Sequence, residues 1–507
     1  MEILQNLLGG LAIAISPMNL LFCFIGVVAG VLIGALPGLG PSAGLAILLP
    51  VTFGFPDPVA GIILLAGIYY GAMYGGSITS VLIGVPGDPA AVMTVADGYP
   101  LAQQGRGGPA LGICAIGSFI GGTLCVLAFT ILGPLLAKVA LSFGPPEYFA
   151  LMVLGLTLVA SFAEKSAIKA FQSAAAGIFI SVIGLDLVTG LPRFTFGQSK
   201  LYEGIDFIVV ALGLYGITEI LISMEDKAIS FKFDRKQLQW RNLLPNAADW
   251  AVSKWVILKS TVVGFLLGML PGSGATICTF IAYAMAKNSA PPERKALFGK
   301  GAIEGVAAPE TANNAASVAA FVPLLTLGVP GSASTAVLMG ALLMFGLQPG
   351  PLLWENNPNF IWGLIGSMYI GNTMLLVLST VCIPFFVRML EVPFPILNAS
   401  VMAFILVGAY SLTNSMFDVG LTLFFGLLGY AMKKMDFPAP PMILALVLGN
   451  TLENSLRQSL ILSQGDIGII FSRPISGVLI TVAIASIAWI IFKSFRNNNS
   501  SQSELTQ

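Results

Sequence analysis

The chain has 507 residues, of which 56% are hydrophobic and only 9% are charged, and its 24 Lys plus Arg balance its 24 Asp plus Glu. Soluble domains carry about 25% charged residues, so this composition indicates a protein that lies in a lipid bilayer, and the balanced charge gives no sign of a nucleic-acid partner. Histidine is absent, which excludes the Ser/His/Asp triad, the Cys/His pair and HExxH zinc chemistry.

Apolar stretches close to the length that a spanning helix needs, about 20 residues, recur from residue 17 almost to residue 492. They predict an all-α polytopic membrane protein with roughly ten to twelve transmembrane helices. In the first half they lie near 17–36, 59–83, 109–133, 147–162, 171–190 and 205–223. In the second half they lie near 255–270, 274–286, 315–347, 360–390, 395–432, 441–450 and 475–492.

Charge divides the chain into four segments. Residues 1–105 contain no Lys or Arg, whereas Lys227–Lys300 contains 11 of the 24. The positive-inside rule therefore places the long polar stretch between the halves in the cytoplasm. We predict a first transmembrane repeat over 1–223, a cytoplasmic linker over 224–254, a second repeat over 255–492 and a disordered C-terminal tail over 493–507.

Two motifs occur once in each half, in the same order. Gly34–Gly40 reads GALPGLG and Gly268–Gly274 reads GMLPGSG, while GVPG occurs at Gly84–Gly87 and again at Gly328–Gly331. Lys/Arg-rich segments flank the second LPG hairpin but not the first, so the positive-inside rule predicts that the two hairpins enter from opposite faces. We therefore expect two inverted-topology repeats with broken, re-entrant helical hairpins.

Pro-Gly pairs interrupt the hydrogen bonding of a helix. In lipid such breaks persist only where they are buried or line a wet cavity, and a break in each half is typical of a transporter's substrate site. The alternative is a set of ordinary kinks or close-packing glycines. The candidate substrate-binding residues of the breaks are Pro37, Gly38, Gly40, Gly84, Pro86, Gly87, Pro271, Gly272, Gly274, Gly328, Pro330 and Gly331.

Hydroxyl and amide side chains cluster beside these breaks. Helix N-termini and hydroxyls can hold a carboxylate without arginine, and freed carbonyls with amide and hydroxyl oxygens can hold sodium. The alternative role is hydrogen bonding between helices. The candidates are Ser42, Ser77, Thr79, Ser80, Ser273, Asn313, Asn314, Ser332 and Ser334, with the two asparagines first.

Two acidic residues lie next to expected breaks, Asp88 in GVPGDPA and Glu310 in APETANN. Together with Asn313 and Asn314 they are candidates for cation coupling. Asp88 could instead cap a following helix, and Glu310 could pair with a loop lysine. Asp97 and Arg106 are expected in an aqueous loop, and the five single cysteines indicate neither disulfides nor a metal site.

The sequence resembles the large membrane subunit of the tripartite tricarboxylate transporter family. The resemblance is carried by GALPGLGPSAGLAILLPVTFGFPDP, IYYGAMYGGSITSVLIGVPGDPAAVMTVADGYPLAQQGRGGPAL, GMLPGSGATICTFIAYAMAK and KGAIEGVAAPETANNAASVAAFVPLLTLGVPGSASTAVLMGAL. It implies a multi-pass permease of the bacterial inner membrane that imports citrate or a related carboxylate. It also implies a small membrane subunit and a periplasmic solute-binding protein as partners, and a sodium or proton gradient as the energy source, with no cofactor beyond a transported or coupling sodium ion.

Two other classes compete with a secondary transporter. An aspartyl intramembrane protease would need a GxGD motif, which the contexts of Asp88 and Asp466 do not provide. A channel would not need inverted, broken-helix repeats. The chain also lacks a GxxxxGK[ST] phosphate loop, so ATP is not the expected energy source, and we expect no enzymatic activity.

Overall fold

The computed structural model describes residues 2–36, 38–55, 57–161, 166–186, 189–225, 243–272, 274–389 and 394–504. It forms two compact units, each assembled from distant stretches of chain: unit 1 combines Met1–Lys138 with Ile208–Tyr430, and unit 2 combines Val139–Phe207 with Ala431–Gln507. Unit 1 therefore holds the LPG and GVPG motifs of both predicted repeats. Residues 226–242 of the expected linker, and the candidates Pro37 and Ser273, lie outside the described residues.

The first part of unit 1 contains one long, deeply buried helix, α4. Pro58 opens this helix and the Asp57 side chain accepts a hydrogen bond from the Val59 N–H at 2.9 Å, which satisfies one of the free donors of the first turn. The elements of this part are α1 (Glu2–Ala14), α2 (Pro17–Gly34), α3 (Gly40–Leu48), η1 (Leu49–Gly54), α4 (Pro58–Ile83), η2 (Pro89–Ala91), α5 (Val92–Gln103) and α6 (Gly107–Ala140).

The second part of unit 1 starts with a helix that contains a π-helical segment and continues with the second set of motifs. Its elements are α9 (Phe207–Ala211), η4 (Leu212–Ile217), α10 (Thr218–Ser223), α11 (Ala247–Gly268), α12 (Gly274–Ser289), α13 (Pro292–Lys295), α14 (Glu304–Ala319), α15 (Phe321–Leu327), α16 (Ala333–Met344), α17 (Pro351–Asn356), α18 (Pro358–Val381), α19 (Ile383–Met389), α20 (Phe394–Thr413) and α21 (Met416–Lys434).

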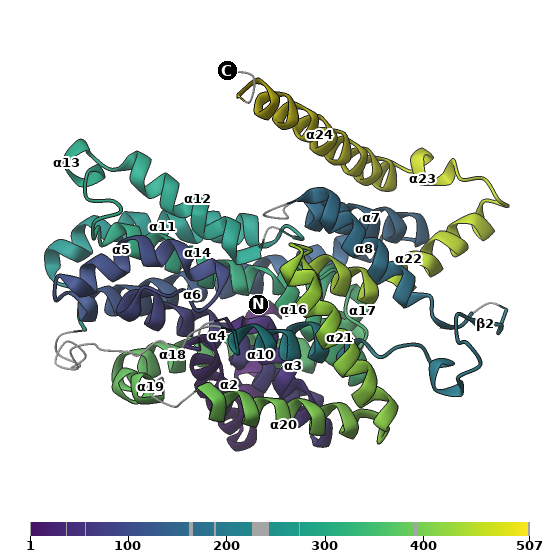
Figure 1. The fold of residues 1–507 in the computed structure, drawn as a ribbon, viewed down its shortest axis with the longest axis horizontal. Coiled ribbons are helices and arrows are strands. Elements are labelled where there is room, and N and C mark those ends of the chain that lie inside the picture. Colours follow the sequence, from purple (N-terminus) through teal and green to yellow (C-terminus); the bar gives the residue numbers. More distant parts are fainter. Residues whose placement is uncertain are drawn as a thin grey trace. The chain divides into compact units, whose positions relative to one another are not determined.

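Equivalent helix pairs pack in the same way in the two halves. An added Cβ on Gly34 of α2 would lie 2.0 Å from the Ala72 carbonyl oxygen of α4, and one on Gly268 of α11 would lie 2.6 Å from Cα of Ala316 on α14. Each pair thus closes around a small residue at the end of its first helix. In Figure 1 the pair α2 and α4 is purple, and the pair α11 and α14 is teal.

Unit 2 packs α22 against α7 and α8, and α24 against α7. Its elements are α7 (Pro145–Ser161), α8 (Ala167–Ser181), the antiparallel strands β1 (Gly184–Leu185) and β2 (Pro192–Arg193), η3 (Ser199–Leu201), α22 (Ala439–Leu462), α23 (Ile469–Ser472) and α24 (Pro474–Glu504). The helical assignment of α24 includes residues 493–504, which the sequence predicts to be a tail without regular structure.

Arg193 and Arg457 bridge Asp186 and Glu453 in unit 2, with N–O distances of 2.7–3.4 Å. This network gives a structural role to the polar segment around Glu453, because it ties the hairpin to α22.

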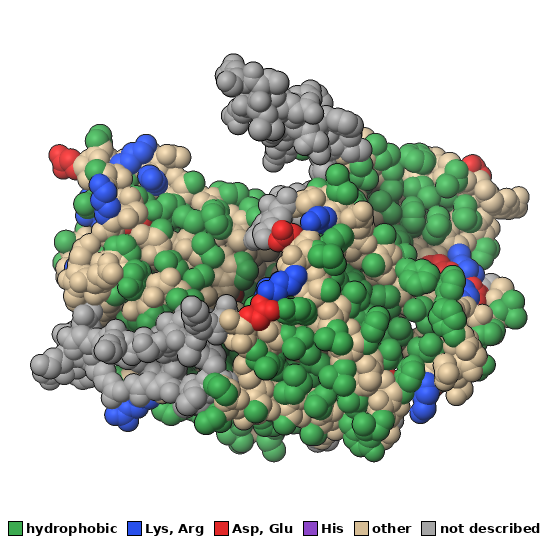
Figure 2. All heavy atoms as spheres, viewed as in Figure 1, with side chains coloured by type: hydrophobic (Ala, Val, Ile, Leu, Met, Phe, Trp, Pro, Cys, Tyr) green, Lys and Arg blue, Asp and Glu red, His purple; other side chains and the backbone are tan. Residues whose placement is uncertain are grey.

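Seven helices in the described part of the chain are long and apolar enough to cross a membrane. Shorter apolar helices of 10–17 residues accompany them, and two of these, starting at Gly40 and Ala333, follow directly after breaks. Figure 2 shows hydrophobic side chains over most of the visible face, with charged side chains in a few places. The protein is therefore an all-α polytopic membrane protein.

Candidate functional site

Both GVPG motifs end a helix in the same conformation. α4 ends at Ile83 and α15 at Leu327, and the following residues, Gly84 and Gly328, both have φ 72°. The next N–H group, on Val85 or Val329, donates to the carbonyl six residues earlier, at 3.4 and 3.2 Å. A left-handed residue at this position strongly favours glycine, so the motif is a helix terminator in each half.

The residue after each GVPG caps the next helix. Asp88 accepts a hydrogen bond from the Ala91 N–H at 2.8 Å, and Ser332 accepts one from the Thr335 N–H at 3.2 Å. Their backbone angles are nearly the same, with φ/ψ of −146°/171° and −151°/169°. Asp88 is therefore a helix cap, one of the two roles that the sequence allows, and its equivalent in the other half is neutral.

The LPG hairpin and the GVPG break of each half are joined by a backbone hydrogen bond. The Gly38 N–H donates to the Gly87 carbonyl at 3.1 Å, and the Gly272 N–H donates to the Gly331 carbonyl, also at 3.1 Å. The structure thus joins the two break segments of each half. The described break residues are Gly38, Gly40, Gly84, Pro86 and Gly87 in the first half, and Pro271, Gly272, Gly274, Gly328, Pro330 and Gly331 in the second.

The two halves meet where α4 crosses α14. The Tyr69 ring lies 5.8 Å from the ring of Phe321 just beyond α14, the Met73 carbonyl accepts a hydrogen bond from the Asn313 amide at 3.1 Å, and Ser77 bonds to Glu310. The residue numbers of the partners thus decrease from 321 to 310 while those along α4 increase from 69 to 77, so the two helices run antiparallel. Tyr69 also bonds to Ser332 at 3.3 Å.

Glu310 lies at the centre of this crossing and is fully buried. The Ser77 hydroxyl donates to one carboxylate oxygen and the Thr94 hydroxyl of α5 donates to the other. Asp88 is 7% exposed and close enough to interact electrostatically with Glu310. Among the described residues no Lys or Arg forms an ion pair with either carboxylate, so the expected alternative of a lysine partner for Glu310 is not what the structure shows.

Three residues of α14, the helix that carries Glu310, have unsatisfied polar atoms in the described structure. Asn313 Oδ1, Asn314 Nδ2 and Thr311 Oγ1 are buried without a hydrogen-bond partner in the described structure. A buried polar group left unpaired costs about 1–3 kcal/mol, and such groups mark places where water or an ion is needed. Thr311 points at α6, where an added Cβ on Gly117 would lie 2.5 Å from its hydroxyl.

The other predicted hydroxyls have local roles. Ser80 bonds to the Ala91 carbonyl at 3.2 Å and Thr79 to the Gly76 carbonyl at 3.2 Å. Ser334 is buried in α16 and Ser42 is half-buried in α3.

Thr94 is a site residue that the sequence analysis missed. It lies in α5, beyond the motif, and its partner Glu310 is 216 positions away, so local sequence gave no signal for it.

The expectation of an aqueous loop is wrong for Asp97, whereas Arg106 lies in the connection between α5 and α6 with its side chain 39% exposed. Asp97 lies in α5 and is fully buried, and Arg106 pairs with Asp249 at the start of α11 at 2.6 Å. The sequence around them is rich in polar residues and glycine, but the second half of the protein covers it.

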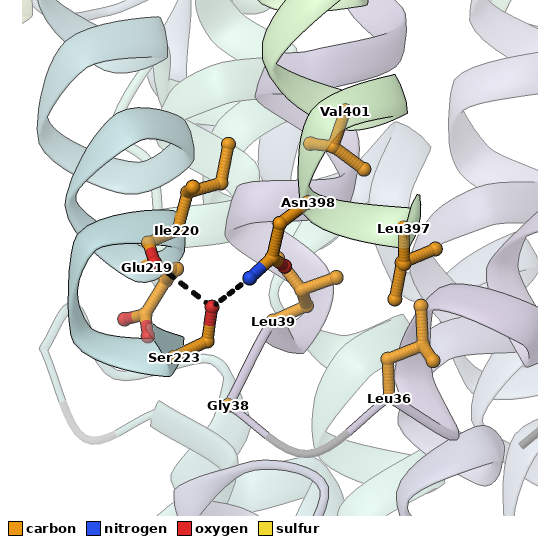
Figure 3. A pocket seen from close by; sticks show the side chains of 9 residues that line it. All are labelled: Leu36, Gly38, Leu39, Glu219, Ile220, Ser223, Leu397, Asn398 and Val401. Atoms are coloured by element: carbon orange, nitrogen blue, oxygen red, sulfur yellow. Dashed lines mark hydrogen bonds between the residues drawn. The ribbon is translucent and has the colours of Figure 1, made fainter. Parts of the chain in front are cut away.

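A pocket lies beside the first LPG hairpin. Figure 3 shows Glu219 next to the hairpin, and the Asn398 amide bonded to Ser223, which in turn bonds to the Ile220 carbonyl. Its lining residues are Leu36, Gly38, Leu39, Glu219, Ile220, Ser223, Leu397, Asn398 and Val401. Glu310 is not among these residues, whereas Asp88 lies beside the hairpin, because an added Cβ on Gly40 would lie 3.6 Å from Asp88 Cβ.

The fold and this interior define a polytopic membrane protein with paired helix breaks around buried, uncompensated carboxylates. Comparison with known proteins identifies the group: the chain belongs to the Tripartite tricarboxylate transporter TctA family, whose family model matches residues 20–444. It is accordingly a tricarboxylate transporter large subunit.

Two curated relatives come from Agrobacterium vitis. One, described as an uncharacterized 52.8 kDa protein in the TAR-I ttuC' 3' region, is 42% identical over 500 residues, which covers 98% of each chain. The other, an uncharacterized protein in the TAR-II ttuC' 3' region, is 39% identical over 234 residues, 46% of this chain and 96% of its own. No solved structure matches the chain.

Proposed function

We propose that this chain is the permease subunit of a binding-protein-dependent secondary transporter of the bacterial inner membrane. It imports tricarboxylates such as citrate, or related carboxylates, and a sodium or proton gradient drives it. Its partners are a small membrane subunit and a periplasmic solute-binding protein. Family membership supports the solute class and the partners, and the buried carboxylates support the coupling.

The observation that carries the coupling is Glu310 with Asp88 in an interior without basic partners. A buried charge costs several kcal/mol unless it is compensated, and two nearby carboxylates raise that cost. A cation or a proton that binds to the carboxylates removes this energetic cost. Asn313, three residues after Glu310 on α14, offers a buried neutral oxygen, Oδ1, of the kind that sodium accepts as a ligand.

A carboxylate solute must be attracted by positive electrostatic potential, and the break segments contain no Lys or Arg that could supply it. Helices α3, α5, α12 and α16 begin at or shortly after the breaks, and the structure packs α3 against α16 and α12 against η2. Helix N-termini carry partial positive charge and free N–H groups. The hydroxyls and amides of the breaks supply further donors, and bound cations complete the charge balance.

The test is uptake of labelled citrate into proteoliposomes that contain all three subunits, with and without a sodium or proton gradient. We expect uptake to require a gradient, and the Glu310→Gln protein to lose gradient dependence. Glu355→Gln, at an exposed position of α17, is the matched control and should behave as wild type. Equal uptake by wild type and Glu310→Gln, with or without a gradient, would contradict the coupling assignment.

A further inference from the structure

Asp97 is a buried carboxylate that the proposed site does not use. Its Oδ1 accepts hydrogen bonds from three backbone N–H groups of one loop, those of Gly299, Gly301 and Ala302, at 2.8, 2.9 and 2.8 Å. Its Oδ2 accepts the Tyr283 hydroxyl at 2.9 Å. The carboxylate is thus fully hydrogen-bonded, and its role differs from that of the cation-binding candidates.

The loop is shaped around this carboxylate. Gly299 and Gly301 have φ of 83° and 112°, which turns their N–H groups toward one point, and such angles favour glycine. At Gly305, in the first turn of α14, an added Cβ would lie 2.0 Å from Asp97 Oδ2. Residues 299–305 therefore closely surround the side chain of Asp97 and bind its carboxylate.

Helix α5 is fastened to this segment at three levels. Thr94 bonds to Glu310, Asp97 bonds to residues 299–302, and Gln104, just after α5, bonds to the Lys300 carbonyl at 2.8 Å. Thr94 and Asp97 are three residues apart and so share one face of the helix. A helix fixed at Asp97 cannot rotate or slide without moving the Thr94 hydroxyl away from Glu310.

We propose that Asp97 is a positioning residue of the transport site: by holding the loop that leads into α14, it sets the place of Thr94 against Glu310. The inference rests on the proposed function, because it assigns cation binding to Glu310. It makes α5, which belongs to the first repeat by sequence, part of the same rigid body as α14 of the second repeat.

The test compares Asp97→Ala with Asp97→Asn and Gln104→Ala. An asparagine keeps an oxygen acceptor for the three N–H groups, so Asp97→Asn should restore most of the wild-type behaviour. Asp97→Ala should raise the half-saturating concentration of the driving cation about tenfold, with a smaller change in the maximal rate. Gln104→Ala removes one contact to the same loop, at an exposed position after the end of α5, and should raise the half-saturating concentration less than Asp97→Ala does.

A second measurement does not depend on transport. The hydrogen bonds from residues 299–302 to Asp97, which we call the Asp97 clamp, restrain the chain around Lys300. Trypsin should therefore cleave the solubilised Asp97→Ala protein after Lys300 faster than it cleaves wild type or Asp97→Asn. The rate of cleavage after Lys254 serves as the reference. If wild type shows no uptake, the proposed function fails, while proteolysis still shows whether Asp97 restrains the chain around Lys300. Faster cleavage with an unchanged half-saturating concentration would overturn the positioning role.

Gly305→Ala provides the same test if Asp97→Ala is not recovered as folded protein. Its added methyl group would displace Oδ2 while the carboxylate remains. We expect a higher half-saturating cation concentration and faster cleavage after Lys300; unchanged values of both would overturn the proposal.

Discussion

Asp97 and Glu310, two buried carboxylates of unit 1, differ in the donors around them. Three backbone N–H groups donate to Oδ1 of Asp97, and the Tyr283 hydroxyl donates to its Oδ2. Glu310 has two hydroxyl partners. A hydroxyl donates to a carboxylate and accepts from a carboxylic acid. The surroundings of Glu310 therefore tolerate gain and loss of a proton or cation, as coupling requires.

The first prediction concerns the asparagines of α14. We expect Asn313→Ala and Asn314→Ala proteins to fold and insert, and to show a higher half-saturating sodium concentration or no uptake. Loss of one charge-assisted hydrogen bond costs about 1.5–3 kcal/mol, on the order of tenfold to a hundredfold in affinity. Uptake assays over a range of sodium concentrations measure it.

Thr79→Val is the control for this pair. The Thr79 hydroxyl bonds only within its own helix in the described structure, to the Gly76 carbonyl, so the valine protein should keep wild-type sodium dependence. If both asparagine variants also transport with unchanged solute and sodium dependence, these residues are packing contacts rather than ligands.

The second prediction is a pH dependence in unit 2. The Arg193 guanidinium donates to Glu453 and, with Arg457, holds the pKa of that carboxyl below its ordinary value of 4.5. Because the folded-state pKa is lowered, the stabilisation is present above the unfolded-state pKa and is lost as pH falls through the folded-state pKa. Glu453→Gln should therefore lower Tm modestly at pH 7, and by less as the pH falls below about 4.

Thermal unfolding of both proteins across that pH range measures the effect. A Tm difference that stays constant with pH would show that the lost stability is not due to the charge of Glu453.

At the scale of elements, the two halves contain equivalent helix breaks that differ in how tightly they are packed. In the first half an added Cβ on Gly87 would lie 2.3 Å from the Gly34 carbonyl oxygen and 2.5 Å from Cα of Gly76. In the second half the nearest atoms to an added Cβ on Gly331 lie at 3.3 Å. The first break is thus packed more tightly than its equivalent.

The third prediction follows from this difference. Gly87→Ala forces backbone atoms apart and should cost about 1–3 kcal/mol, as overpacking does, whereas Gly331→Ala should cost less. Thermal stability and uptake of the two variants test this, with Gly54→Ala, which meets nothing within 4 Å, as the neutral control. Equal losses at Gly87 and Gly331 would contradict the packing difference.

At the scale of the whole molecule, the antiparallel crossing of α4 and α14 is the arrangement that an inverted repeat requires. Each helix precedes the GVPG motif of its half, and the residue numbers of the contacting residues increase along one helix while they decrease along the other. Inversion places two equivalent breaks around one interior, so that each half can present it to one side of the membrane in turn.

The fourth prediction is that the connections after α3 and after α12 lie on opposite sides of the membrane. Single cysteines at Gly54 and Glu293, both exposed positions, should react with an impermeant maleimide from opposite faces when placed in a cysteine-free background. The position 293 should label from the cytoplasmic side because Lys and Arg surround it. Labelling of both from one side would rule out the inversion.

The sequence alone was sufficient for the helical membrane class, because 56% hydrophobic residues with 9% charge leave no other stable environment. It also located the breaks, since proline and glycine act on the backbone locally. It could not choose between a cap and a coupling role for Asp88, or between a coupling role and a lysine partner for Glu310, because those depend on residues far along the chain.

The tertiary structure decided those partners. Ser77 and Thr94 lie 233 and 216 positions from Glu310, and they reach it only because α4 and α5 pack against α14. The loop at 299–302 likewise buried Asp97, whose polar neighbours predict an aqueous loop. Composition and local backbone chemistry thus determine where the helices lie and break, whereas the close approach of the two halves determines which carboxylates are satisfied and which remain available for a cation.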